Sequence, residues 1–70
     1  MLDASATLDG LEALLRDPAN TQRTRTLVSG ICRIDVELVQ GVTHWRTNGL
    51  TCSRQSAVDA LENARAAKAV

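Results

Sequence analysis

The stretch ICRIDVELVQGVTHWRTNGLTC, residues 31–52, decides the fold of this chain. It is rich in β-branched residues and is interrupted by dipeptides whose second residue is glycine. Such dipeptides are typical of tight hairpin turns, because the central residues of these turns adopt positive φ. Two of these dipeptides, Gln40-Gly41 and Asn48-Gly49, lie within the stretch, and a third, Ser29-Gly30, precedes it. Their spacing predicts an antiparallel meander with strands at residues 23–28, 31–39 and 42–47.

A two-residue turn at Gln40-Gly41 sets the register of the second and third strands. It places Val36 opposite Trp45, a β-branched residue against an aromatic one, which is a stabilising cross-strand pair. The Asn48-Gly49 turn then places Trp45 opposite Cys52, and a Ser29-Gly30 turn places Thr26 opposite Arg33. The register further pairs Asp35 with Arg46 and Glu37 with His44.

The two faces of this predicted sheet differ in polarity. The apolar face collects Cys32, Ile34, Val36, Leu38, Trp45 and Cys52. The polar face collects Arg33, Asp35, Glu37, His44 and Arg46. Antiparallel sheets that are covered on one face only alternate in this way. We therefore expect Trp45 in the core and the charged residues in solvent.

Helices are predicted at both ends of the chain, at residues 5–16 and 53–68. The first carries leucines at three- and four-residue spacing, with Ser5 or Thr7 as the N-cap and a stop at Asp17-Pro18. The second begins after Ser53, a favourable N-cap. The apolar stripes of the two helices are Leu8, Leu11, Leu14 and Leu15, and Ala57, Val58, Leu61 and Ala64.

We predict that residues 1–70 form a single small α+β domain of two layers, ordered helix, three-stranded antiparallel meander, helix, with both helices on the Val36 and Trp45 face. The alternative is an all-α helical hairpin with a long central helix. Apolar residues of the middle stretch do recur at helical spacing, but Gly30 and Gly41 would each cost about 1 kcal/mol inside a helix. The strand interpretation is favoured for this reason.

Composition argues against several classes of function. Eight basic and eight acidic residues give a formal net charge of zero, so a bulk electrostatic attraction to nucleic acid is disfavoured. Trp45 is the single aromatic residue, which leaves little for stacking of bases. A chain of 70 residues is one small domain or a piece of something larger, and it hides only about 60 % of its unfolded surface on folding. A chain of this length is too short to form a cofactor-binding fold and a substrate pocket side by side.

The sequence also predicts a cytoplasmic protein that contacts no membrane. No apolar run approaches the roughly 20 residues that span a bilayer. Asp3, Asp9 and Glu12 precede the first basic residue, which is unlike a signal peptide. Two cysteines make no disulfide framework, and reduced thiols suit the cytosol.

Residues that carry chemistry are few. Cys32, His44 and Cys52 are the soft metal ligands of the chain, and their spacing matches no common zinc pattern. The predicted register places His44 on the face opposite the cysteines, so a metal site and a cysteine–histidine catalytic pair are both disfavoured. We therefore expect no metal, no cofactor and no enzymatic activity.

Candidate interaction residues are charged or titratable and belong to the predicted sheet. Arg23 and Arg25 form the one local basic cluster, on a strand that the prediction places at an edge of the sheet. Open edges are available for pairing with another chain. The complete set is Arg23, Arg25, Arg33, Asp35, Glu37, His44 and Arg46.

The stretch IDVELVQG followed by SRQSAVDALENA resembles the second strand and closing helix of the double-stranded RNA-binding domain, over roughly the C-terminal half of the chain. The resemblance implies the same order of elements and a nucleic-acid-binding role. That family's closing helix opens with lysines directed at phosphates. Here the matching stretch is residues 53–56, SRQS, and Asp59 follows one turn later, where an acidic residue opposes RNA binding.

The first functional hypothesis is a small non-enzymatic protein-interaction module. It would act as a homodimeric regulator or inhibitor of a larger protein, of the kind that phages and other mobile elements carry against host defences such as CRISPR. The alternatives are a nucleic-acid-binding regulator of the topology just described, and a structural subunit of a larger assembly.

Overall fold

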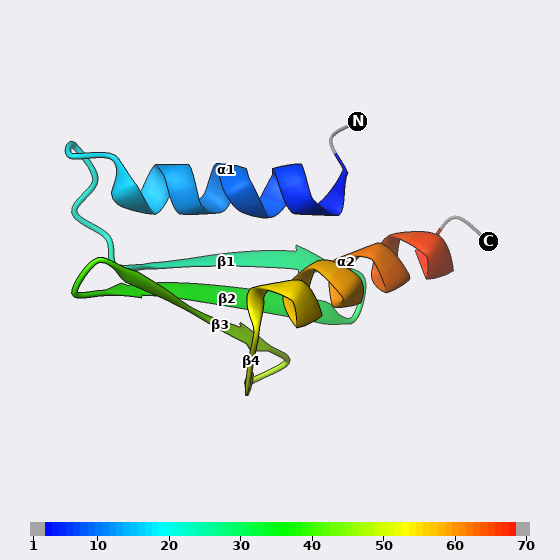
Figure 1. Ribbon diagram of the computed structural model, residues 1–70. Coiled ribbons are helices and arrows are strands. Elements are labelled where there is room, and N and C mark those ends of the chain that lie inside the picture. Colours follow the sequence, from blue (N-terminus) through cyan, green and yellow to red (C-terminus); the bar gives the residue numbers. More distant parts are fainter. Residues whose placement is uncertain (1–2, 69–70) are drawn as a thin grey trace.

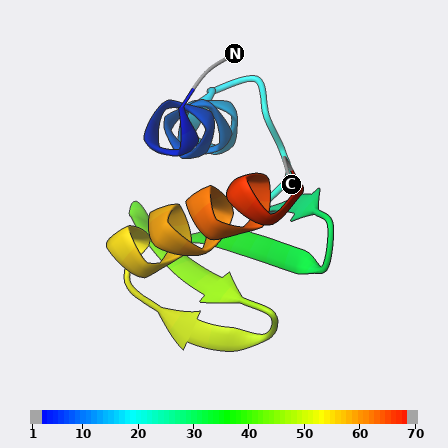
Figure 2. The same cartoon turned by 90° about the vertical axis from the view of Figure 1, so that its right-hand side faces the viewer.

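A computed structural model describes residues 3–68 and shows two helices and a four-stranded antiparallel sheet (Figure 1). The elements are α1 (Ala4–Arg16), β1 (Thr24–Ser29), β2 (Cys32–Val39), β3 (Val42–Thr47), β4 (Leu50–Cys52) and α2 (Arg54–Lys68). Neighbouring strands in the sheet follow chain order, and both helices lie on the same face (Figure 2). The predicted two-layer α+β fold is confirmed. The expected number of strands was one too few, because β4 is only three residues long and too short to show an alternating pattern.

The predicted register of β2 and β3 is confirmed. Val36 lies opposite Trp45, and the turn between the strands is Gln40-Gly41, with φ of 50° and 80°. The second hairpin turn, Asn48-Gly49, has φ of 50° and 84° and sets Trp45 opposite Cys52. Positive φ at both central residues fits a type I′ turn, whose twist matches that of the strands it joins.

The first hairpin turn lies one residue later than predicted. Ser29 pairs with Cys32, so the turn residues are Gly30 and Ile31, and positive φ (61°) falls on the glycine alone. Positive φ at the first central residue alone fits a type II′ turn, in which glycine is preferred at that position.

This shift changes the pairs between β1 and β2. Thr26 lies opposite Asp35 and not opposite Arg33 as predicted; Arg33 faces Val28. The partners move by two residues, so every side chain keeps its predicted face.

The sequence predicted one of the two helix N-caps correctly. Asp3 caps α1, because its Oδ1 accepts from the N–H of Ala6 at 2.7 Å; the predicted caps Ser5 and Thr7 lie inside the helix. The helix ends at Arg16 before Pro18, as predicted. The predicted cap of α2 is confirmed, since Ser53 Oγ accepts from the N–H of Ser56 at 3.1 Å.

One apolar core lies between the helices and the sheet. Trp45 is 4 % exposed and Val36 is fully buried, as predicted. Leu14 was expected in the stripe of α1 but is 47 % exposed, because the helix turns that side away from the sheet. The buried residues are Ala4, Leu8, Leu15, Cys32, Ile34, Val36, Trp45, Ala57, Val58 and Leu61.

Candidate interaction surface

The face of the sheet opposite the helices is open. Side chains that alternate with the core residues along each strand project from it, and we call this set the open face. Its members are Thr24, Thr26, Val28, Arg33, Asp35, Glu37, Val39, Val42, His44, Arg46 and Thr51. Five of the seven candidate interaction residues therefore share one surface.

The centre of the open face is a hydrogen-bonded group around Asp35. Its Oδ1 accepts from Thr26 Oγ1 at 2.6 Å and from Arg33 Nε at 3.3 Å. These contacts leave the Asp35 side chain only 17 % exposed, whereas the Arg33 side chain is 63 % exposed. The carboxylate is thus held by its neighbours, while the guanidinium extends into solvent.

A second ion pair crosses between β2 and β3. Arg46 lies directly opposite Asp35, as predicted, but its Nη2 lies 3.6 Å from Glu37 Oε1, on the diagonal. Asp35 instead pairs with Arg33 of its own strand. The sequence predicted which residues are neighbours across the strands. It did not predict which carboxylate pairs with each arginine, because an arginine side chain is long enough to reach the diagonal position.

His44 lies directly opposite Glu37 and helps to line a shallow hollow of about 100 Å³ with Thr24, Asp35 and Arg46. Sites that enclose a small molecule are commonly about 300–1,000 Å³. Both carboxylates beside the hollow already have arginine partners. A hollow of this volume can accommodate one side chain of a partner, and an adjoining hollow of about 290 Å³, bordered by Val39 and Thr51, continues along the same face.

Apolar side chains stand at the ends of the open face. Val39 and Val42 face each other beside the β2–β3 turn and are 42 % and 56 % exposed. Val28, at the opposite end of β1, is 65 % exposed. The surface thus combines a charged centre with apolar ends, the reverse of the usual protein interface, in which an apolar centre is surrounded by a polar rim.

The remaining two candidate residues lie elsewhere. Arg25 projects toward the helix side of β1, where it is partly buried and its Nε is hydrogen-bonded to no described residue. Arg23 precedes β1, is exposed, and borders a hollow beside the α1–β1 connection with Leu15 and Leu38. The structure therefore does not join the predicted basic cluster to Arg33 and Arg46.

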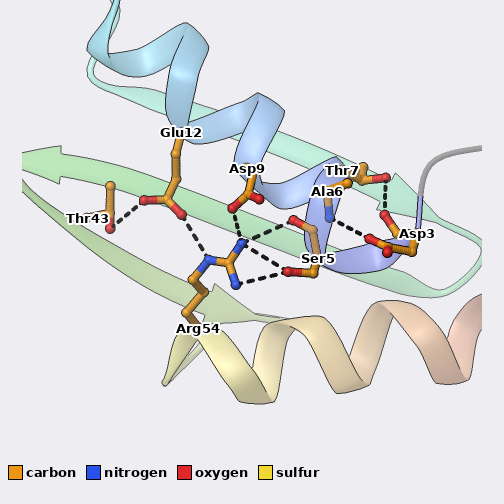
Figure 3. A network of polar contacts seen from close by, with 8 residues as sticks. All are labelled: Asp3, Ser5, Ala6, Thr7, Asp9, Glu12, Thr43 and Arg54. Carbon is orange, nitrogen blue, oxygen red and sulfur yellow. Dashed lines mark hydrogen bonds and ion pairs between the residues drawn. The ribbon is translucent and has the colours of Figure 1, made fainter.

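A polar cluster that sequence reasoning missed ties the start of α2 to α1 (Figure 3). Arg54 Nε donates to Glu12 Oε1 at 3.0 Å, and Arg54 Nη2 forms an ion pair with Asp9. The same Nη2 donates to the carbonyl of Ser5 at 3.1 Å, and Glu12 also accepts from Thr43 Oγ1 at 3.3 Å. Three elements, α1, β3 and α2, therefore meet at these side chains.

The charges of this cluster stabilise one another. The hydrogen bond to Glu12 raises the pKa of the Arg54 guanidinium above its ordinary value, and the nearby Asp9 carboxylate acts in the same direction, against a lowering by burial. Positive charge in the first turn of a helix opposes the helix dipole. That local conflict was the signal in the sequence, and the α1 carboxylates resolve it.

The cysteines and the histidine remain apart. Cys32 and Cys52 are free thiols; Cys32 is buried, and Cys52 Sγ lies 3.2 Å from Thr47 Oγ1. Within residues 3–68, no three side chains of the metal-binding types gather into a site. Neither described helix is long and apolar enough to cross a bilayer.

Comparison of the chain with protein-family models, with curated proteins and with solved structures finds no match.

Proposed function

We propose that this chain is a small non-enzymatic protein-interaction module that regulates or inhibits a larger protein by docking its open face onto it. Accessory proteins of phages and other mobile elements act in this way. The observation that carries the proposal is the composition of the open face, on which charged side chains and exposed valines occupy one uncovered side of the sheet.

The charged centre supports specificity. Arg33 and Arg46 are 63 % and 52 % exposed, so each guanidinium has donors left for a carboxylate or carbonyl of a partner. The partner complementary to this surface presents carboxylates near the two arginines and an apolar side chain against Val39 and Val42.

The arrangement of arginines gives little support to the nucleic-acid alternative. Arg33 and Arg46 each have a carboxylate partner, Arg54 is bound to α1, and Arg25 lies on the other side of the sheet. A nucleic-acid surface needs several cations directed at phosphates. Arg54 occupies the position at which the RNA-binding family places its phosphate-contacting lysines, and it is already engaged.

The proposal includes a homodimer and a cytoplasmic location. A domain of 70 residues has a core that supplies no more than about 3–5 kcal/mol, so self-association would stabilise it by mass action. Two copies would also present two open faces to the larger partner and so raise its effective affinity.

Affinity capture with matched variants tests the proposal. The tagged chain is compared with a triple variant, Arg33→Thr/Arg46→Thr/Val42→Thr, which empties the open face while keeping β-branched residues in the strands. The expected result is a stoichiometric protein partner that the unmodified chain retains and the triple variant loses.

The control is Arg23→Thr, which removes an exposed arginine outside the open face and should retain the partner. Circular dichroism must show that all the variants are folded. If the triple variant keeps the partner, or if no stoichiometric partner is found, the proposal is wrong.

A further inference from the structure

Within residues 3–68, the outer edge of β1 carries backbone groups that pair with no other strand. The carbonyl of Arg23 accepts from the N–H of Leu38 at 2.8 Å, which fixes the phase of the ladder between β1 and β2. Alternate residues of an antiparallel strand direct their backbone groups to opposite sides. The N–H and C=O groups of Thr24, Thr26 and Val28 therefore point away from β2. β1 is an edge strand of the sheet (Figure 1).

We propose that a second copy of this chain pairs with this edge, β1 against β1, to form a continuous eight-stranded antiparallel sheet. The inference rests on the self-association in the proposed function and does not depend on the larger partner. The two-fold axis passes between Thr26 and the same residue of the second copy. Thr24 of each copy then lies opposite Val28 of the other.

Charge selects this register over its neighbour. With the axis at Thr26, Arg25 lies opposite Leu27 of the second copy, and its aliphatic stem packs on an apolar partner. With the axis at Thr24, Arg23 would face Arg25 of the second copy, and like charges directly opposite each other are destabilising. The favoured register forms Thr–Thr and Thr–Val pairs on the open face. It also lets the outward backbone groups of Thr24, Thr26 and Val28 form hydrogen bonds with the second copy.

An exposed leucine supports the same occupant. On a helical wheel, Leu14 lies about 140° from Asp9 and about 160° from Glu12, so it is on the flank of α1 away from the Arg54 cluster. A two-fold axis normal to the sheet places α1 of both copies on the same side of the combined sheet. The second copy therefore brings its own α1 beside that flank, where it can cover Leu14, which is 47 % exposed in the single chain.

The test uses substitutions at the axis. Proline at position 26 removes an N–H that makes no hydrogen bond to any described residue, so Thr26→Pro should weaken the dimer and leave the chain folded. It also removes the Oγ1 that donates to Asp35, so Thr26→Val, which loses the same hydroxyl but keeps the N–H, is the side-chain control and should remain dimeric. Thr51→Pro is the matched control, because the backbone N–H of Thr51 points outward in the same way from the other edge strand, β4. A charged pair, Thr26→Lys and Thr26→Glu, tests the register, because the axis places each residue 26 opposite its own copy.

Sedimentation velocity from about 10 μM to 1 mM measures the mass, since contacts of this small size are weak. We expect a monomer–dimer equilibrium for the unmodified chain and for Thr51→Pro, and a Kd raised at least about tenfold for Thr26→Pro. Thr26→Lys and Thr26→Glu should each be monomeric alone and dimeric when mixed in equal amounts. Circular dichroism confirms that each variant is folded.

A monomer at all concentrations, or a dimer that Thr26→Pro leaves unchanged, would overturn the β1 contact. A mixture of the two charged variants that stays monomeric would overturn the register. In the capture experiment, Leu14→Asp, which lies on the flank of α1 and outside the open face, should weaken the dimer and still retain the larger partner. Loss of the dimer and loss of the proposed function are therefore separate outcomes.

Discussion

Removing the Arg54 side chain should destabilise the fold by about 2 kcal/mol. The guanidinium donates to Glu12 at 3.0 Å and to the carbonyl of Ser5 at 3.1 Å, and it forms an ion pair with Asp9. A hydrogen bond to a charged group contributes about 1.5–3 kcal/mol, and an exposed ion pair about 0–1 kcal/mol. The Arg54 side chain is 33 % exposed and Asp9 68 %, so solvent screening places the sum toward the lower end of these ranges.

The assay for Arg54→Ala is urea unfolding followed by the fluorescence of Trp45, the single tryptophan, which is 4 % exposed in the folded chain. A loss of about 2 kcal/mol corresponds to a fall in Tm of roughly 8–16 °C for a domain of this size. Arg54→Lys keeps the charge but not the planar fork of donors, so it should lose about half as much.

A double-mutant cycle with Glu12→Gln isolates the central contact. We expect a coupling free energy of about 1 kcal/mol between positions 12 and 54. Because the pKa of Arg54 is raised, its contribution is fully present below the ordinary arginine pKa and is lost only at still more alkaline pH. The effect of Arg54→Ala should not change between about pH 6 and 9, where arginine stays charged. A loss below about 0.5 kcal/mol, or no coupling to Glu12, would refute this account of the cluster.

Three further predictions follow from local geometry and charge. Gln40 has φ of 50°, a region that asparagine tolerates better, so Gln40→Asn should stabilise the chain by about 0.5–1 kcal/mol in urea unfolding. Ser53→Ala removes the side-chain oxygen that caps α2 and should cost about 1 kcal/mol, measured by thermal unfolding. Fluorescence anisotropy with a double-stranded RNA should show no binding even at low salt, because the exposed arginines are paired or dispersed; binding that weakens steeply with added salt would favour the nucleic-acid alternative.

Local rules predicted the centre of the fold. Once Gln40-Gly41 is assigned as the turn, the pairing of Val36 with Trp45 follows, because a two-residue loop leaves one register. The first turn was misplaced because Ser29-Gly30 has the same form as the other two dipeptides. Whether glycine takes the first or the second central position depends on the turn type, which the dipeptide does not reveal.

Long-range polar contacts were beyond sequence reasoning. Arg54 reaches residues more than 40 positions away, and its position at the start of α2 gives no indication of the partner. The open face could be predicted from the sequence, because strand alternation alone places Arg33, Asp35 and Glu37 on one side of the sheet. Strand alternation equally places Arg25 on the side opposite Arg33 once β1 is defined.

His44 can report directly on the proposed contact between the open face and the partner. His44 is the single histidine of the chain, is exposed, and lies opposite Glu37 on that face. Its rate of modification by diethyl pyrocarbonate, measured by mass spectrometry with and without the captured partner, should fall at least about fivefold in the complex, because a docked surface excludes reagent and water. An unchanged rate at His44 in a stoichiometric complex would contradict the account.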